Sequence, residues 1–178
     1  LASSFRPRRG TDVDQLGQLC KAVLGSIDVR DLGKMSTDEL VTNLEHVLHT
    51  IRIRRSGEIV TNVRQEGEDI VIESCVDDQP FLVSALRALA AGEKCEVKSS
   101  LNAISKLRRD RNGKLLEFGR GTAESIIRME VRPNDGGKIS PELIERLEPI
   151  AAREPWCRAD AKAWWSKHGE AIARRRTG

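Results

Sequence analysis

The stretch that decides the fold covers residues 72–90 and reads Ile-Glu-Ser-Cys-Val-Asp-Asp-Gln-Pro-Phe-Leu-Val-Ser-Ala-Leu-Arg-Ala-Leu-Ala. It begins as a β-rich run and ends as an apolar run with the spacing of one helical face. We therefore predict a strand, a short acidic turn and a helix. In this turn Asp77 or Asp78 is expected to cap the helix, Pro80 to occupy its first turn, and Phe81 to lie on its core face.

Patterns on either side of this stretch predict the remaining elements. Apolar residues at helical spacing predict helices over residues 12–25 and 36–53, and Ser36-Thr37-Asp38-Glu39 opens the second one as a capping box. Alternating residues and turn signals such as Asn112-Gly113 predict strands. The strands are expected at 58–64, 69–76, 94–109, 114–118 and 124–132, and further helices at 79–91, from 140 onward and at 158–174.

In chain order the central elements read β-β-α-β-β-α, which is typical of an antiparallel sheet with helices packed on one face. We therefore predict an α+β fold on the ferredoxin-like plan, with flanking N- and C-terminal helices. A hydrophobic content of 39% supports a core, and aromatic residues make up only 3% of the chain. The expected divisions are a disordered basic tail at 1–11, N-terminal helices at 12–56, the α+β domain at 57–155, and a C-terminal helix with a basic tail at 156–178.

The turn after residue 77 also carries a family resemblance. Asp78-Gln79-Pro80-Phe81-Leu82 resembles the Asp-x-Pro-Gly-x-Leu turn of ACT domains, with Phe81 in place of glycine. Residues 77–85 are more similar to the Asp-Asp-Met-Pro-Phe-Leu-Val-Asp-Ser segment in the N-terminal region of the large bacterial NAD-dependent glutamate dehydrogenases. That family's later Arg-Asp-x-x-Gly turn and Glu-Ser strand resemble residues 109–113 and 124–131. The similarity covers roughly residues 40–165.

This resemblance implies an ACT-like, non-catalytic regulatory or assembly domain. ACT-like modules often bind an amino acid at this turn, where helix N–H groups hold the ligand carboxylate and an acidic side chain meets its ammonium group. The residues that could make such contacts here are Asp77, Asp78, Gln79 and Ser84. Phe81 replaces the glycine that allows close approach, so we expect a structural or assembly role ahead of amino-acid sensing.

A second hypothesis assumes the same fold in a different kind of protein. Ser84-Ala85 replaces the second acidic residue of the family's helix, and the family's His-Pro is absent near Ser99-Ser100. These departures favour a stand-alone protein-interaction or sensory module of a signalling protein.

The sequence holds no catalytic constellation. No G-x-G-x-x-G motif follows a strand, and no Walker motif is present. Asp77 and Asp78 are adjacent and so point in different directions, which does not suit paired catalytic carboxylates. His46 and His49 project away from the apolar helix face, as ordinary surface residues do. We expect no catalytic residue, no metal site and no cofactor in this chain.

The charge and composition of the chain limit the classes of partner that it can bind. The net charge of +3 is too balanced for a dedicated DNA-binding protein, and the basic clusters at 52–55 and 106–114 lack the aromatic platforms of RNA readers. No apolar run approaches the ~20 residues of a membrane span. Cysteines at 20, 75, 95 and 157 form no C-x-x-C pair. We expect a cytoplasmic protein with free thiols that forms a homo-oligomer or packs against sister domains.

Overall fold

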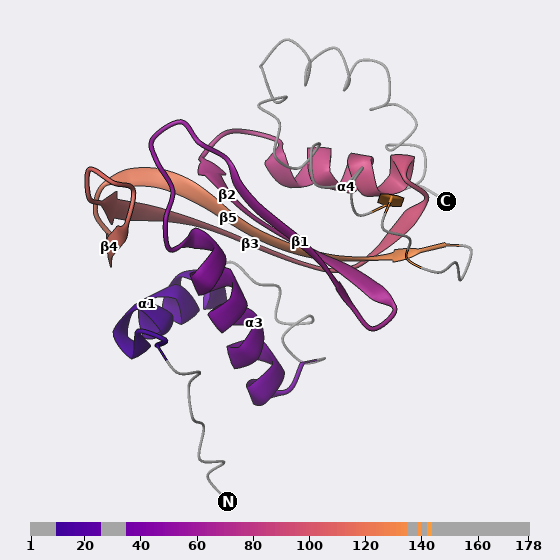
Figure 1. Cartoon of the computed structure of the whole chain (residues 1–178), viewed down its shortest axis with the longest axis horizontal. Coiled ribbons are helices and arrows are strands. Elements are labelled where there is room, and N and C mark those ends of the chain that lie inside the picture. Colours follow the sequence, from indigo (N-terminus) through magenta and orange to yellow (C-terminus); the bar gives the residue numbers. More distant parts are fainter. Residues whose placement is uncertain (1–9, 26–34, 135–138, 140–141, 144–178) are drawn as a thin grey trace, which may run out of the picture.

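The computed structural model describes residues 10–25, 35–134, 139 and 142–143 (Figure 1). In this part of the chain each predicted element is present near its expected place. Helices α1, α3 and α4 span Val13–Leu24, Thr37–Ile51 and Leu82–Gly92, and strands β1 to β5 span Val60–Glu66, Asp69–Asp77, Cys95–Arg109, Leu115–Phe118 and Thr122–Pro133.

The strands form one antiparallel sheet in the order β1-β2-β5-β3-β4. β2 and β3 run in the same direction, α4 connects them, and β5 lies between them. This is the split β-α-β unit of ferredoxin-like folds. β1 extends the sheet beside β2, and β4 pairs with the end of β3. The predicted α+β, ACT-like fold is therefore confirmed.

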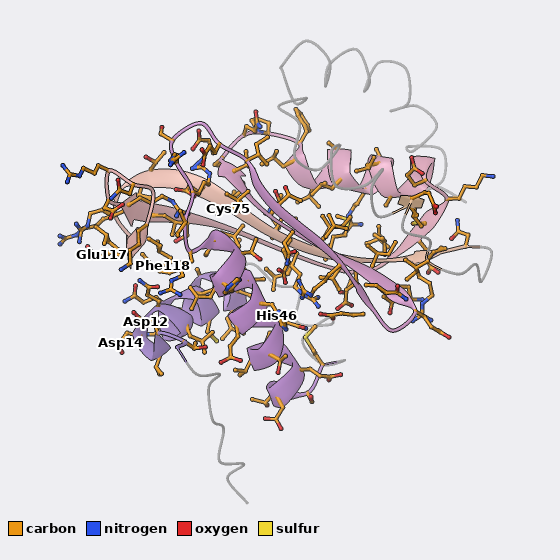
Figure 2. The ribbon with its side chains drawn as sticks, viewed as in Figure 1. Asp12, Asp14, His46, Cys75, Glu117 and Phe118 are labelled. Atoms are coloured by element: carbon orange, nitrogen blue, oxygen red, sulfur yellow. The ribbon has the colours of Figure 1, made fainter. Side chains whose placement is uncertain are left out.

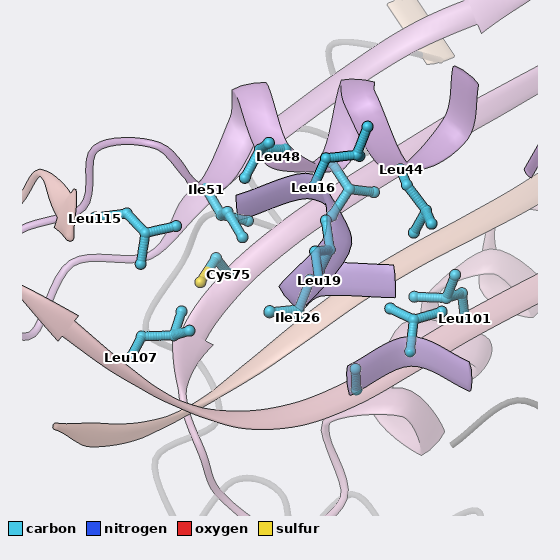
Figure 3. Close-up of a cluster of buried hydrophobic side chains, with 13 residues drawn as sticks. Leu16, Leu19, Leu44, Leu48, Ile51, Cys75, Leu101, Leu107, Leu115 and Ile126 are labelled. Atoms are coloured by element: carbon cyan, nitrogen blue, oxygen red, sulfur yellow. The ribbon is translucent and has the colours of Figure 1, made fainter. Parts of the chain in front are cut away.

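Helices cover both faces of the sheet (Figure 1). α4 packs on one face against buried residues of β2 and β5, and Leu143 joins the same cluster. The flanking helices α1 and α3 pack on the opposite face, around the side chains drawn in Figure 3. Helices on both faces explain why every residue of β2 between its two ends is buried, without the alternation of a strand that has one solvent-facing side.

The starts of the N-terminal helices follow the sequence signals. Asp12 caps α1, because its carboxylate accepts the N–H of Gln15 at 3.0 Å. Ser36 and Glu39 form the predicted capping box at α3: the Ser36 hydroxyl accepts the Glu39 N–H at 3.2 Å, and the Glu39 carboxylate accepts the Ser36 N–H at 2.8 Å. None of the described helices is both long and apolar enough to span a bilayer.

The start of α4 corrects the prediction for the central turn. The helix begins at Leu82, no side chain caps it, and Pro80 precedes its first turn. Phe81 is not a core residue: its side chain is 64% exposed and its backbone is left-handed, with a φ of 72°. The exposure of Phe81 could not be predicted from helical spacing, because Phe81 fits the apolar spacing of α4 although it precedes the helix.

Several predictions fall outside the described residues. These are most of the basic tail at 1–11, most of the helix expected from residue 140, the helix at 158–174 and the tail beyond it. The expected division of the chain at residues 56 and 155 stays a prediction.

Candidate functional site

The two aspartates at the end of β2 have separate partners. Asp77 forms an ion pair with Arg54, which follows α3. Asp78 is exposed, and its Oδ1 accepts a hydrogen bond from the Ser125 hydroxyl of β5 at 2.7 Å. By strand alternation Asp77 shares the face of Cys75, which packs beneath α1 and α3. Each carboxylate therefore has a structural anchor, and neither caps α4.

The N-terminus of α4 lies beside Asp78 in the chain. Its first turn contains no acidic residue and receives no side-chain cap. The first N–H groups of a helix have no partner within the helix and carry a partial positive charge. Gln79 before the helix and Ser84 in its first turn are both half-buried. The structure thus brings three of the four predicted residues, Asp78, Gln79 and Ser84, to one short stretch around this helix end.

The backbone of Phe81 adopts a conformation that favours glycine, the residue found at this position of the ACT turn. A φ of 72° lies in the left-handed region, which glycine enters without steric cost. Phe81 adopts this conformation although it is not glycine, and its ring projects largely into solvent. The turn therefore accommodates the larger side chain without burying it.

A buried ion network supports the turn from the α3 side of the sheet. The Glu124 carboxylate accepts two hydrogen bonds from Arg109, from Nε at 2.8 Å and from Nη2 at 2.9 Å. Arg54 Nη1 lies 3.4 Å from Glu124, and the same guanidinium binds Asp77. Such charges stay buried only when they are paired, which this network achieves. Sequence reasoning missed it, since it placed Arg54 and Arg109 in surface clusters and no spacing links them to Glu124.

Cys75 contacts this network through Glu124 and Arg109, and Figure 2 shows its side chain on the sheet. Its thiol donates to Glu124 Oε2 at 3.1 Å, and the side chain is fully buried. Burial, and then the negative charge of Glu124, raises the pKa of Cys75 far above its ordinary value. A protonated, buried thiol is a poor nucleophile, so the arrangement is structural. Cys20, Cys75 and Cys95 are all free cysteines, as predicted.

A second buried polar cluster lies further along the same face. Glu73 accepts a hydrogen bond from Thr50 of α3 at 2.8 Å and forms an ion pair with Arg64 at 2.8 Å. Arg128 forms an ion pair with Glu130 at 2.6 Å and donates to Asn43 of α3 at 2.9 Å. These contacts attach α3 to β1, β2 and β5.

The two histidines of α3 line a groove between α3 and the segment before α1. The groove has a volume of about 480 Å³, and its walls include Thr11, Asp12, Glu45, His46, His49 and Arg52. His49 is exposed and His46 is half-buried, and Figure 2 shows His46 on α3. Among the described residues no group of three or more His, Cys, Asp or Glu side chains is arranged to hold a metal ion.

The fold and the turn define the class of protein as an ACT-like α+β module. The family model described as glutamate dehydrogenase, ACT1 domain, matches residues 19–147. The chain belongs to this family, and an ACT domain is a non-catalytic module. The predicted resemblance is thereby confirmed. Neither the curated proteins nor the solved structures gave a match.

Proposed function

We propose that this chain is a regulatory domain of a large NAD-dependent glutamate dehydrogenase, and that its β2–α4 turn binds an amino acid. The observation that carries the proposal is the α4 N-terminus without a side-chain cap, next to a carboxylate already held by Ser125. Family membership supports the parent enzyme. A gene whose reading frame contains no dehydrogenase domain after this one would favour the alternative, a stand-alone interaction or sensory module of a signalling protein.

The turn offers complementary groups for a zwitterion. The first N–H groups of α4 suit a ligand carboxylate, because they combine free donors with the positive end of the helix dipole. Asp78 suits the ammonium group, since its position is fixed on the neighbouring strand by Ser125. Gln79 and Ser84 supply neutral polar contacts beside them. Asp77 is already paired with Arg54, so the proposal assigns it to the support of the turn.

A thermal-shift panel of the twenty amino acids on the purified chain tests this function. We expect one amino acid, or a small related set, to raise the melting temperature saturably. Asp78→Asn should abolish the shift while leaving the protein folded, because it removes the charge and keeps a side chain of the same shape. Asp14→Asn, which removes an exposed carboxylate from α1, is the matched control and should leave the shift unchanged. A shift that survives Asp78→Asn would contradict the assignment.

A second candidate function, assembly with another copy or a sister domain, is favoured by the open edge of β3. β4 pairs only with Leu107, Arg108 and Arg109, so residues 96–106 have no second partner strand among the described residues. The segment from Ser99 to Ser105 contains no charge and no proline, the features that usually block pairing at an edge. The bond from the Gly119 N–H to the Lys106 carbonyl at 2.7 Å shows that even-numbered residues of this segment direct their backbone groups outward.

Light scattering on two variants of Ile104 tests assembly through this edge. Ile104 is 58% exposed, so changing its side chain should leave the core intact. Ile104→Pro removes an outward N–H and should convert an oligomer to a monomer. Ile104→Thr keeps the N–H and is the matched control, which should stay oligomeric. An oligomer that persists in Ile104→Pro, or a wild-type chain that is monomeric at all concentrations, would contradict assembly through β3.

A further inference from the structure

Two basic segments that are far apart in the sequence meet at one end of the molecule. The segment Arg52–Arg55 after α3 lies against the β3–β4 hairpin turn, Arg111–Lys114. The Arg54 N–H donates to the Gly113 carbonyl at 2.9 Å, and the Leu115 N–H donates to the Arg52 carbonyl at 2.9 Å. Ile53 and Lys114 form an isolated antiparallel bridge between the two segments. Their mutual position is therefore fixed by the backbone.

Four cations remain on the surface of this junction. Arg54 and Arg109 turn inward to the buried network, whereas Arg52, Arg55, Arg111 and Lys114 are exposed. Among the described residues Arg52, Arg111 and Lys114 form no ion pair, and Arg55 is 75% exposed with only a 3.8 Å contact to Glu58.

Two carboxylates, Asp110 and Glu58, lie at the junction, and both are hydrogen-bonded to its backbone. Asp110 accepts the N–H groups of Asn112 at 2.8 Å and Lys114 at 2.9 Å, so it holds the hairpin turn. Glu58 accepts the Arg55 N–H at 2.9 Å. These bonds leave the carboxylates charged, but the four exposed cations outnumber the two carboxylates, so the junction keeps an excess of positive charge.

Exposed aliphatic side chains accompany these cations. Ile53 is 60% exposed and lies opposite Lys114 in the bridge, and Leu116 on β4 is also exposed. Solvated charge clusters do not need such neighbours, whereas protein interfaces combine apolar anchors with a charged rim. We name Arg52, Ile53, Arg55, Arg111, Lys114 and Leu116 the basic–apolar surface. Glu117 and Phe118, labelled in Figure 2, mark the same end of the sheet.

We propose that the basic–apolar surface docks an acidic segment of a partner protein that carries an aliphatic side chain between its carboxylates. Charge complementarity with the four exposed cations selects an acidic partner, and Ile53 with Leu116 selects an apolar anchor. This proposal stands independently of the amino-acid site, because it uses none of the residues assigned to ligand contacts at the β2–α4 turn.

Other occupants fit the surface less well. Single-stranded nucleic acid uses aromatic side chains for stacking, and the basic–apolar surface has none. A second copy would have to offer acidic residues, and the acidic tip of the β1–β2 hairpin is the nearest candidate. Its carboxylates are already paired, Glu66 with Arg64 at 2.8 Å and Asp69 with Arg132 at 2.6 Å.

Fluorescence anisotropy with short labelled peptides tests the proposal on the whole 178-residue chain. The probe is a peptide of glutamate and leucine, and a peptide of glutamate and serine with the same charge is its comparison. We expect the leucine peptide to bind more tightly than the serine peptide, and salt to weaken its binding. Arg55→Glu combined with Lys114→Glu should weaken it by about tenfold or more, mainly through association. Ile53→Ser should bring the two peptides to similar affinity.

A matched control separates local from global charge. Arg87→Glu combined with Lys98→Glu makes the same change in net charge on α4 and β3 and should leave peptide binding unchanged. Equal weakening by both pairs, or equal affinity for the two peptides in the wild-type chain, would overturn the docking surface. A labelled oligouridine that binds this surface more tightly than the leucine peptide would also overturn it, in favour of nucleic acid.

Discussion

At the scale of single residues, Phe81 is one of two described non-glycine residues, with Lys94, whose backbone is left-handed. A left-handed conformation costs an L-residue about 1–2 kcal/mol, and the exposed ring recovers little of this through burial. We expect Phe81→Gly to raise the free energy of unfolding by about 1 kcal/mol, because glycine removes the strain at some cost in chain entropy. Phe81→Ala should change it by less than ~1 kcal/mol rather than by the ~3–5 kcal/mol of a core phenylalanine. Urea denaturation measures both, and a large loss in Phe81→Ala would place the ring in a core.

Cys75 sets a pH dependence at the alkaline end. Its pKa is raised in the folded protein above the ordinary value of 9.0, so the folded state keeps a proton that the unfolded state loses. The stabilisation is therefore complete below about pH 9 and decreases as the pH rises above it, by up to about 1.4 kcal/mol per pH unit.

Cys75→Ser isolates this effect, because serine keeps a hydroxyl donor for Glu124 and does not ionise in this range. Urea denaturation at about pH 8 and about pH 10 should show a larger loss of stability in the wild-type protein than in Cys75→Ser. Equal losses of stability in the two proteins would show that Cys75 does not cause the decrease in stability at alkaline pH.

At the scale of elements, the β3–β4 hairpin and the segment after α3 depend on one glycine. A Cβ atom at Gly113 would lie 2.5 Å from the Arg54 carbonyl oxygen, and its φ is +85°. Gly57 has a similar φ of +77°, and nothing lies within 4 Å of its Cβ position. Gly57→Ala should therefore cost about 1 kcal/mol through backbone strain alone, and Gly113→Ala more than ~3 kcal/mol through strain and clash.

Chemical denaturation of the two alanine variants compares them directly. Similar costs for both would mean that the hairpin does not contact the Arg52–Arg55 segment as described. In Gly113→Ala the hairpin should move away from the Arg52–Arg55 segment, which would separate Ile53 from Lys114. At temperatures where this variant remains folded, it should therefore bind the acidic peptide more weakly than the wild-type chain does.

The elements themselves were predictable where local signals were strong. Asp12 and the Ser36–Glu39 capping box marked two helix starts, and period-two runs with Asn112-Gly113 marked the strands. The start of α4 was not predictable in this way. Its acidic turn has the sequence of a helix cap, but the two carboxylates bind Arg54 and Ser125 instead. Those partners are distant in the sequence, and only the sheet register brings them together.

At the scale of the whole molecule, the order of elements was sufficient to predict an antiparallel sheet with helices packed on one face. The order of elements did not predict that α1 and α3 cover the other face, because the apolar side of a helix does not specify the sheet face on which the helix packs. The buried Arg54–Glu124–Arg109 network is a consequence of that second layer. It explains why β2 and β5 carry charged residues within otherwise apolar strands.

The site can be judged in the same terms. Asp78, Gln79 and Ser84 were selected by resemblance, and the structure adds the uncapped helix end and the hydroxyl of Ser125. Family membership identifies the module. The proposed amino-acid site depends on side-chain contacts that no local pattern encodes.

The most direct test of the central claim is a titration of the isotope-labelled chain with the stabilising amino acid, followed through backbone amide resonances. We predict saturable shifts concentrated at Leu82, Val83 and Ser84, together with Asp78, because the proposed site holds the ligand carboxylate at the first amides of α4 and its ammonium group at Asp78. Shifts that leave these amides unchanged and gather instead along the groove between α3 and the segment before α1 would contradict a regulatory site at the β2–α4 turn.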